Sequence, residues 1–238
     1  MSLTTDAFER IRHAIVSGGL ELGEPLSETQ IATALGMSKA PVRAAFIELR
    51  DKGLVNIVPQ SGTYVFSPTA EDVRTMSHFR ALLEEEAMTQ AYRVARDRMF
   101  ARLDVAIEAM RRAVATQNWE AYREGDSAFH LAFLEECGNR YILRAYHLTS
   151  TALEALRVRL QRGETLFRER SFREHCEIAA FLREDRPEQA AALLRQHIVI
   201  INEWLHALPL TINKGTRKDK PDDRDYAAVF AAQDNRRG

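Results

Sequence analysis

The chain has 238 residues, of which 45% are hydrophobic and 28% charged, and its formal net charge is −1. This composition fits a globular protein of two modest domains, and it excludes a disordered or strongly basic chain. Two distant cysteines exclude a disulfide framework and a cysteine-based zinc site. No signal peptide and no apolar run of about 18 residues is found, which predicts a cytoplasmic protein without membrane contact.

The first 68 residues alternate short helical and extended patterns. An opening helix is expected over residues 4–17, because apolar residues recur there at helical spacing. A second, short helix follows Ser27, which stands three residues before Gln30 in the spacing of a capping box, and Gly36 ends it.

A third helix begins near Ser38 and carries Lys39 and Arg43 together on a face away from its apolar residues. Two β-rich runs then surround a turn with Gly62 at its tip. Helix, tight turn, helix and hairpin form a winged helix-turn-helix, in which one helix enters the major groove of DNA. A structural helical hairpin with solvated charges is the alternative. The expected DNA contacts are Ser38, Lys39, Pro41, Arg43, Gln60 and Gly62.

The charge of this segment does not by itself favour DNA. Residues 1–68 hold six Lys or Arg against seven Asp or Glu. The prediction therefore depends on where the cations lie, and a homodimer would double the reading helices.

One set of residues runs through the whole segment: Leu26-Ser27-Glu28, Ile31-Ala32, Leu35-Gly36, Ser38-Lys39, Pro41-Val42-Arg43, Ala45, Leu49, Gly53-Leu54-Val55, Gly62 and Val65. With these residues the segment resembles the DNA-binding domain of GntR-type bacterial regulators. The resemblance implies double-stranded operator DNA as the partner. Lys39 stands where the family usually has Arg, and Lys lacks the bidentate fork of Arg.

Residues 69–209 show no strand pattern and predict an all-helical bundle, so we expect a mainly α chain. Its six helices are expected over 70–96, 98–116, 118–136, 140–162, 169–183 and from Pro187 onward. Residues 210–238 form a tail that is expected to be flexible over 211–220. Tyr226, Val229 and Phe230 predict one more short helix that docks on a neighbour.

Four ionisable residues stand on the apolar faces of these helices. Asp126 and His130 are four residues apart on one face, and His175 and His197 each lie 11 residues from Arg186 in a predicted turn. His175 and His197 should therefore lie at the same height along the two helices of an antiparallel hairpin. A buried carboxylate and three imidazoles satisfy one another if they share a divalent cation. Ordinary hydrogen-bonded histidines and a local ion pair are the alternative.

These residues belong to a wider pattern: Asp126-Ser127-Ala128-Phe129-His130, Gly138-Asn139, Glu174-His175 and His197. The pattern resembles the FadR-like effector domain of GntR regulators, the FCD fold. The resemblance implies a metal site at the floor of a pocket for a small carboxylic acid, with the ligands Asp126, His130, His175 and His197. Zinc is the expected ion, with nickel and manganese as alternatives.

Arg80 lies on an inward stripe and matches an arginine in the first helix of that effector domain. It would hold the effector anion in a bidentate contact, or else pair with Glu84 one turn later. Arg157 and Arg159 are further candidates for effector binding.

The predicted function is a dimeric transcription regulator, a repressor released from its operator by a small organic acid. No catalytic residue is assigned, and no enzyme activity is expected. Two alternatives stay open. One is a metal-dependent hydrolase in which Glu135 or Glu174 assists a metal-activated water, and the other is a regulator that senses the metal itself.

Overall fold

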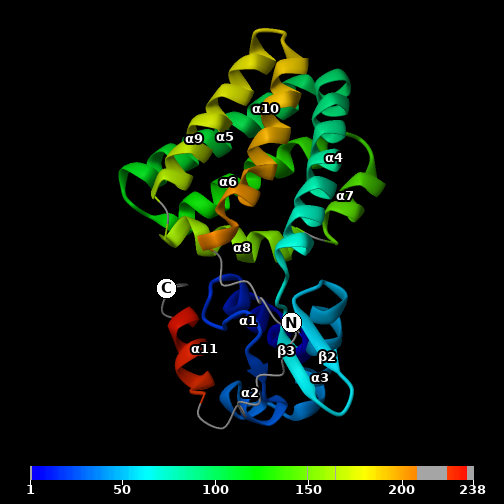
Figure 1. Cartoon of the computed structure of the whole chain (residues 1–238), viewed down its shortest axis with the longest axis vertical. Helices are drawn as coiled ribbons and strands as arrows, with labels where there is room; N and C mark the ends of the chain where they lie inside the picture. Colours follow the sequence, from blue (N-terminus) through cyan, green and yellow to red (C-terminus); the bar gives the residue numbers. More distant parts are fainter. Residues whose placement is uncertain (1, 149, 164, 208–223, 235–238) are drawn as a thin grey trace. The chain divides into compact units, whose positions relative to one another are not determined.

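The computed structural model describes residues 2–148, 150–163, 165–207 and 224–234 (Figure 1). Its contacts divide the chain into two units, each described here by itself. The first unit contains residues 2–70 and the described parts of 148–159 and 208–238, and the second contains 71–147 and the described parts of 160–207. The expected mainly helical fold, with a winged helix-turn-helix followed by a helical bundle, is confirmed.

The first unit begins with a three-helix arrangement and a small sheet. Its elements are α1 (Leu3–Val16), β1 (Pro25–Leu26), α2 (Glu28–Ala34), α3 (Lys39–Asp51), β2 (Val55–Val58) and β3 (Gly62–Val65). The sheet is antiparallel with the strand order β1-β3-β2. The sequence did not predict β1, because a strand of two residues is too short to show an alternating pattern.

Local signals explain where the helices of the winged helix begin and end. The Ser27 Oγ accepts a hydrogen bond of 3.3 Å from the Gln30 amide and so caps α2. Gly36 and Gly53 follow α2 and α3 with φ angles of 66° and 70°, which glycine adopts without strain. The face of α3 that packs inward is apolar and includes Phe46. The opposite face of α3 is therefore left to solvent.

Two helices from later in the chain also belong at least in part to the first unit. They are α8 (Ser150–Gly163), whose residues up to 159 lie in this unit, and α11 (Tyr226–Asp234). The short helix expected around Tyr226 is thus present, and it contacts α1 and α2 of the same chain. The stretch 211–220, expected to be flexible, lies outside the described residues.

The second unit is a helical bundle. Its elements are α4 (Ala70–Val94), α5 (Arg96–Ala115), α6 (Trp119–Glu136), α7 (Arg140–Tyr146), α9 (Thr165–Arg183), α10 (Pro187–Val199) and the 3-10 helix η1 (Ile200–Ala207). The single helix expected over 140–162 is wrong, because α7 ends at Tyr146 and α8 starts at Ser150. His147 is the C-cap residue of α7, and the chain turns at His147 and Leu148.

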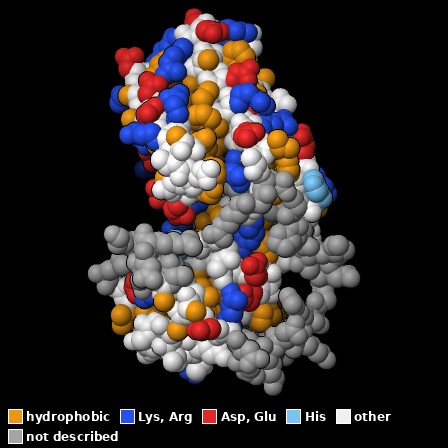
Figure 2. All heavy atoms as spheres, turned by 90° about the vertical axis from the view of Figure 1, so that its left-hand side faces the viewer, with side chains coloured by type: hydrophobic (Ala, Val, Ile, Leu, Met, Phe, Trp, Pro, Cys, Tyr) orange, Lys and Arg blue, Asp and Glu red, His pale blue; other side chains and the backbone are white. Residues whose placement is uncertain are grey.

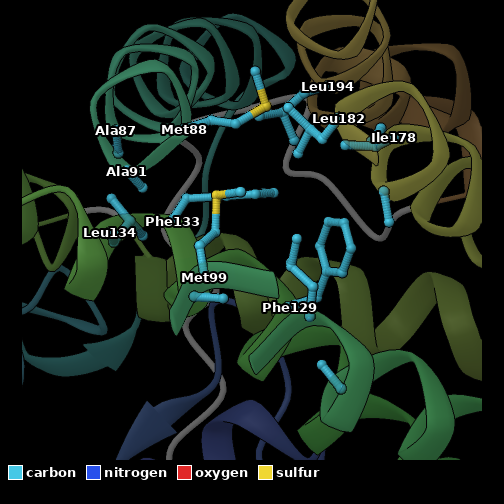
Figure 3. Packing of buried hydrophobic residues seen from close by; sticks show 14 of the residues in the cluster. Ala87, Met88, Ala91, Met99, Phe129, Phe133, Leu134, Ile178, Leu182 and Leu194 are labelled. Atoms are coloured by element: carbon cyan, nitrogen blue, oxygen red, sulfur yellow. The ribbon is translucent and has the colours of Figure 1, made fainter. Parts of the chain in front are cut away.

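The core of the bundle is built from apolar residues of α4, α5, α6, α9 and α10 (Figure 3). Met88, Phe133 and Leu182 lie close together there, although they come from three different helices. Gly125 lets α5 and α6 approach closely, since a Cβ at this position would lie 2.8 Å from the Met110 Cγ. This close contact fixes the helix that carries Asp126 and His130.

The surface of the second unit is mixed in charge. On the face seen in Figure 2, acidic, basic and hydrophobic side chains are interspersed over its helices. This agrees with the net charge of −1. Among the described helices, none combines the length and the apolar character that a membrane crossing needs.

Candidate functional site

The residues predicted to contact DNA begin with the exposed N-terminal part of α3. Ser38 is the N-cap residue, and its side chain makes no capping hydrogen bond. Ser38, Lys39 and Arg43 are exposed, whereas Pro41 is partly buried. They lie where a recognition helix meets base edges.

Arg43 is held in place by a neighbouring helix. Its Nε and Nη2 donate hydrogen bonds of 3.0 and 2.9 Å to the two carboxylate oxygens of Glu28 on α2. The hydrogen bond and the charge of Glu28 raise the pKa of Arg43 above its ordinary value. Because the side chain is still 69% exposed, the guanidinium is oriented and yet accessible.

The hairpin supplies the second group of expected contacts. Gln60 and Gly62 lie exposed at its tip, with φ angles of 62° and 133° in the left-handed region. The Tyr64 hydroxyl lies 3.0 Å from the Ser61 Oγ, which braces the turn from within. Of the residues at this tip, Gln60 is the side chain best placed to reach a DNA backbone.

The second candidate site is a cluster of buried histidines in the helical unit. His130 on α6, His175 on α9 and His197 on α10 have exposed fractions of 0, 0 and 6%, and one ring nitrogen of each lies within 4.8 Å of the others. The buried Asp126 lies beside them, with its Oδ1 3.7 Å from the Nε2 of His175. The structure therefore brings together the four residues that the sequence singled out.

Two carboxylates determine which ring nitrogens face the centre of the cluster. The Nδ1 of His130 donates to Glu84 over 2.6 Å, and the Nδ1 of His197 donates to Glu174 over 2.9 Å. An ionised carboxylate can only accept, so a neutral ring carries its proton on Nδ1 and presents the lone pair of Nε2. The Nε2 of His130 lies 3.5 Å from the Nε2 of His175.

Each of these carboxylates is bound in turn by an arginine. Arg80 donates to Glu84, and both side chains are buried. Burial opposes the charge on Arg80, but the attraction of Glu84, Tyr146 and Asp126 outweighs it and raises the pKa of the guanidinium. The Nη2 of Arg80 is buried and has no hydrogen-bond partner among the described residues.

The second arginine acts on Glu174 in the same way. Arg170 donates to Glu174 over 2.7 Å. Burial raises the pKa of the Glu174 carboxyl, but hydrogen bonds from His197 and Arg170 outweigh it, so the pKa lies below its ordinary value.

Sequence reasoning missed the roles of Glu84 and Glu174 as partners of the histidines. The sequence predicts Glu84 only as a partner of Arg80, and Glu174 as part of the family pattern and as an acid or base of the hydrolase alternative. A signal was present, because Glu84 continues the buried stripe of α4 through Arg80 at helical spacing. Which histidine it meets depends on the packing of α4 against α6, and the sequence does not give that packing.

Two other predicted arginines lie on α8. The Arg159 guanidinium donates to the carbonyl oxygens of Ile15 and Leu20, over 3.2 and 2.9 Å. It therefore binds the end of α1 in the first unit. Arg157 is partly buried on the same helix, in the part that belongs to the first unit. Its role in effector binding stays a prediction.

The carboxylates proposed for hydrolysis have other partners. Glu174 binds His197 and Arg170, and Glu135 pairs with Arg102 at the surface of α6. Glu174 lies beside the cluster but is occupied by His197 and Arg170, and Glu135 lies away at the surface, so neither is available as a general base, which argues against the hydrolase alternative.

The donor set of the cluster fits a divalent metal ion. Three imidazoles and one carboxylate suit zinc or nickel, and two of the histidines carry the carboxylate partners on Nδ1 that metal-binding histidines usually have. The residues that would hold the ion are Asp126, His130, His175 and His197.

A winged helix-turn-helix with an exposed recognition helix, followed by an all-helical domain with a buried polar site, defines a DNA-binding protein with a second, helical domain. Comparison with known families agrees. Residues 3–65 match the model of the bacterial regulatory proteins of the gntR family, and residues 75–199 match the FCD domain. The chain belongs to the GntR family of DNA-binding transcription regulators, in the group with an FCD domain.

Individual relatives support this assignment. The chain is 26% identical to the transcriptional repressor RspR of Escherichia coli K12, over 81% of this chain and 84% of the relative. It is 23% identical to the gluconate operon repressor of Bacillus licheniformis, over 61% and 59% of the two chains. A solved structure of a GntR regulator from Rhodococcus sp. RHA1 has the same fold, with a TM-score of 0.72 and 23% identity over 87% of this chain and 98% of that one.

Proposed function

We propose that this transcription regulator is a homodimeric repressor that leaves its operator when a small carboxylic acid binds in a metal-containing site of the FCD domain. Repression is supported by relatives that carry the name of repressors. A protein that reads operator DNA works in the compartment that holds the DNA, and we place it in the bacterial cytoplasm.

The observation that carries the proposal is the arrangement of the three histidine rings and their carboxylate partners. Glu84 and Glu174 fix the tautomers of His130 and His197, so lone pairs converge on one buried point. Lone pairs that face each other without a shared cation or proton would be unfavourable. A divalent ion bound by Asp126 and the three histidines satisfies them together, with zinc as the expected ion.

The effector class follows from the charges around this point. A bound divalent ion would add positive charge and open positions that a carboxylate fills. Arg80 stands on the far side of Glu84, and its Nη2 has an unused donor among the described residues. An anion bound by both the metal ion and Arg80 would be recognised at two points. The relative from Bacillus licheniformis is named for a gluconate operon, and gluconate is itself a carboxylate.

Release from DNA requires that the acid prefer one arrangement of the protein. The three histidines come from α6, α9 and α10, so a ligand in their midst changes the packing of three helices at once. We propose that the arrangement favoured by the acid holds the two recognition helices of a dimer in positions that do not match the operator. Lys39 and Arg43 of α3, with Gln60 and Gly62 of the wing, are the proposed DNA contacts.

Metal content and thermal stability of the purified protein test the metal site. We expect about one divalent ion per chain in the wild type, and its loss in the double variant Asp126→Ala, His175→Ala. His78→Ala is the matched control, because His78 is an exposed histidine of the same unit. A metal-free wild type, or a double variant that melts like the wild type, would contradict the metal site.

The effector is tested with a panel of small carboxylic acids in the same melting experiment. One class of acid should raise the melting temperature of the wild type and not that of the double variant. That acid should also weaken binding to a duplex selected from random-sequence DNA with the wild-type protein. If the metal alone weakens DNA binding and no acid adds to its effect, the metal itself is the signal.

A further inference from the structure

The last helix of the chain lies outside both family models and yet packs on the winged helix. The two models cover residues 3–65 and 75–199, whereas α11 starts at Tyr226. Tyr226 and Phe230 are exposed by only 2 and 1%, and α11 contacts α1 and α2. We infer that α11 is an essential part of the DNA-binding unit, and that Tyr226 positions the helix-turn-helix for operator binding.

The hydroxyl of Tyr226 supplies one of the two hydrogen bonds that a capping box would make at the start of α2. It accepts a hydrogen bond of 3.2 Å from the Ser27 amide and donates one of 3.2 Å to the Pro25 carbonyl. In a complete capping box the side chain three residues later would bind the amide of the N-cap residue. Here Tyr226, from a helix almost 200 residues later, binds that amide in place of Gln30.

The remaining contacts of α11 hold the segment that leads from α1 into β1. The Arg224 side chain, just before α11, donates to the carbonyl of Gly19 and lies 3.0 Å from the carboxylate of Glu24. The Val229 side chain covers Gly19, whose added Cβ would lie 3.4 Å from it. The Arg10 guanidinium of α1 lies over the ring of Phe230, 5.6 Å from its centre. Polar and apolar contacts therefore hold α11 and the preceding Arg224 against the rest of the first unit.

The contact at Ser27 lies one residue from Glu28, the partner of a proposed DNA contact. Glu28 follows Ser27 directly and holds the guanidinium of Arg43 through two hydrogen bonds. A shift in the first turn of α2 would therefore displace Glu28 and with it Arg43. In this way α11 acts on the recognition helix without touching DNA. This link to Arg43 rests on its proposed role in reading DNA.

Two variants test the inference: a single substitution in the full-length chain, and a truncated chain. The first is Tyr226→Phe, which keeps the ring and removes the hydroxyl, and its matched control is Tyr141→Phe, because Tyr141 is 64% exposed on α7. The second is a chain that ends at residue 223. Each is measured for affinity to the duplex selected with the wild type, at fixed salt, and for hydrogen exchange of the Ser27 amide.

Tyr226→Phe should weaken DNA binding by about three- to tenfold and speed exchange of the Ser27 amide, because both hydrogen bonds of the hydroxyl are lost. Tyr141→Phe should change neither. The truncated chain should bind DNA at least about tenfold more weakly, and a synthetic peptide of residues 224–234 should restore affinity. Rescue by the peptide separates loss of the contact from general misfolding.

The inference is overturned if Tyr226→Phe leaves both affinity and amide exchange unchanged. It is also overturned if a folded truncated chain binds DNA like the wild type. Arg43→Met serves as the reference for the DNA site itself. If Arg43→Met weakens binding and the α11 variants do not, only the role of α11 is wrong. If Arg43→Met has no effect, the proposed DNA contact is wrong instead.

Discussion

Both candidate sites include an arginine bound by a glutamate, and these two pairs differ in their surroundings. In the winged helix, Arg43 and Glu28 have side chains that are 69 and 25% exposed. In the helical unit, Arg80 and Glu84 are 4 and 0% exposed. An exposed pair contributes little to stability, so Arg43 can separate from Glu28 at a small cost in free energy. Separating a buried pair costs much more free energy, so Arg80 and Glu84 hold His130 in a fixed position.

The largest expected effect comes from breaking the buried pair. Arg80→Met should lower the free energy of unfolding of the helical unit by about 3–5 kcal/mol, because it leaves the Glu84 carboxylate buried without its cation. The measurement is urea unfolding of protein treated with a chelator, followed by circular dichroism.

Arg98→Met is the control for this change, since Arg98 pairs with Glu136 while being 70% exposed. It should cost no more than about 1 kcal/mol. Equal losses in the two variants would mean that burial of the Arg80 pair has no special energetic role.

The sequence was sufficient for those parts of the molecule whose signals are local. Ser27, Gly36 and Gly53 mark the helix ends of the winged helix, and the four polar residues on apolar stripes indicated the buried cluster. Partners that depend on packing were not predictable. Glu84 on α4 meets His130 on α6 only in the folded bundle, and Tyr226 meets Ser27 from 199 residues later in the chain. Helical periodicity predicts which face of a helix is buried, but not which residues of other helices pack against that face.

A smaller effect is expected from the close contact of α5 and α6. Gly125→Ala should lower the free energy of unfolding by about 1–3 kcal/mol, because the new Cβ overlaps Met110 and lies 3.2 Å from the backbone oxygen of Ala106. Glu124→Ala, at an exposed position of the same helix, should stay within about 0.5 kcal/mol of the wild type. A stable Gly125→Ala protein would show that α5 and α6 can separate without loss.

The smallest effect on stability is expected from the exposed pair. Arg43→Met should leave the free energy of unfolding almost unchanged, because solvent screens this pair. Its affinity for the selected duplex should nevertheless fall by about tenfold or more. Arg50→Met, later on α3 and paired with Asp51, is the control and should bind DNA normally. If both variants lost affinity equally, Arg43 would be no more than one of several surface cations.

The contact between Tyr226 and Ser27 also has a consequence for synthesis of the protein. A ribosome adds about 5–20 residues per second, so it takes on the order of 10–30 s to extend the chain from residue 70 to residue 226. During that interval the residues of the winged helix have been synthesised, but the helix that binds the Ser27 amide and covers Gly19 has not. A nascent chain would therefore reach its full DNA-binding form only after α11 has been added.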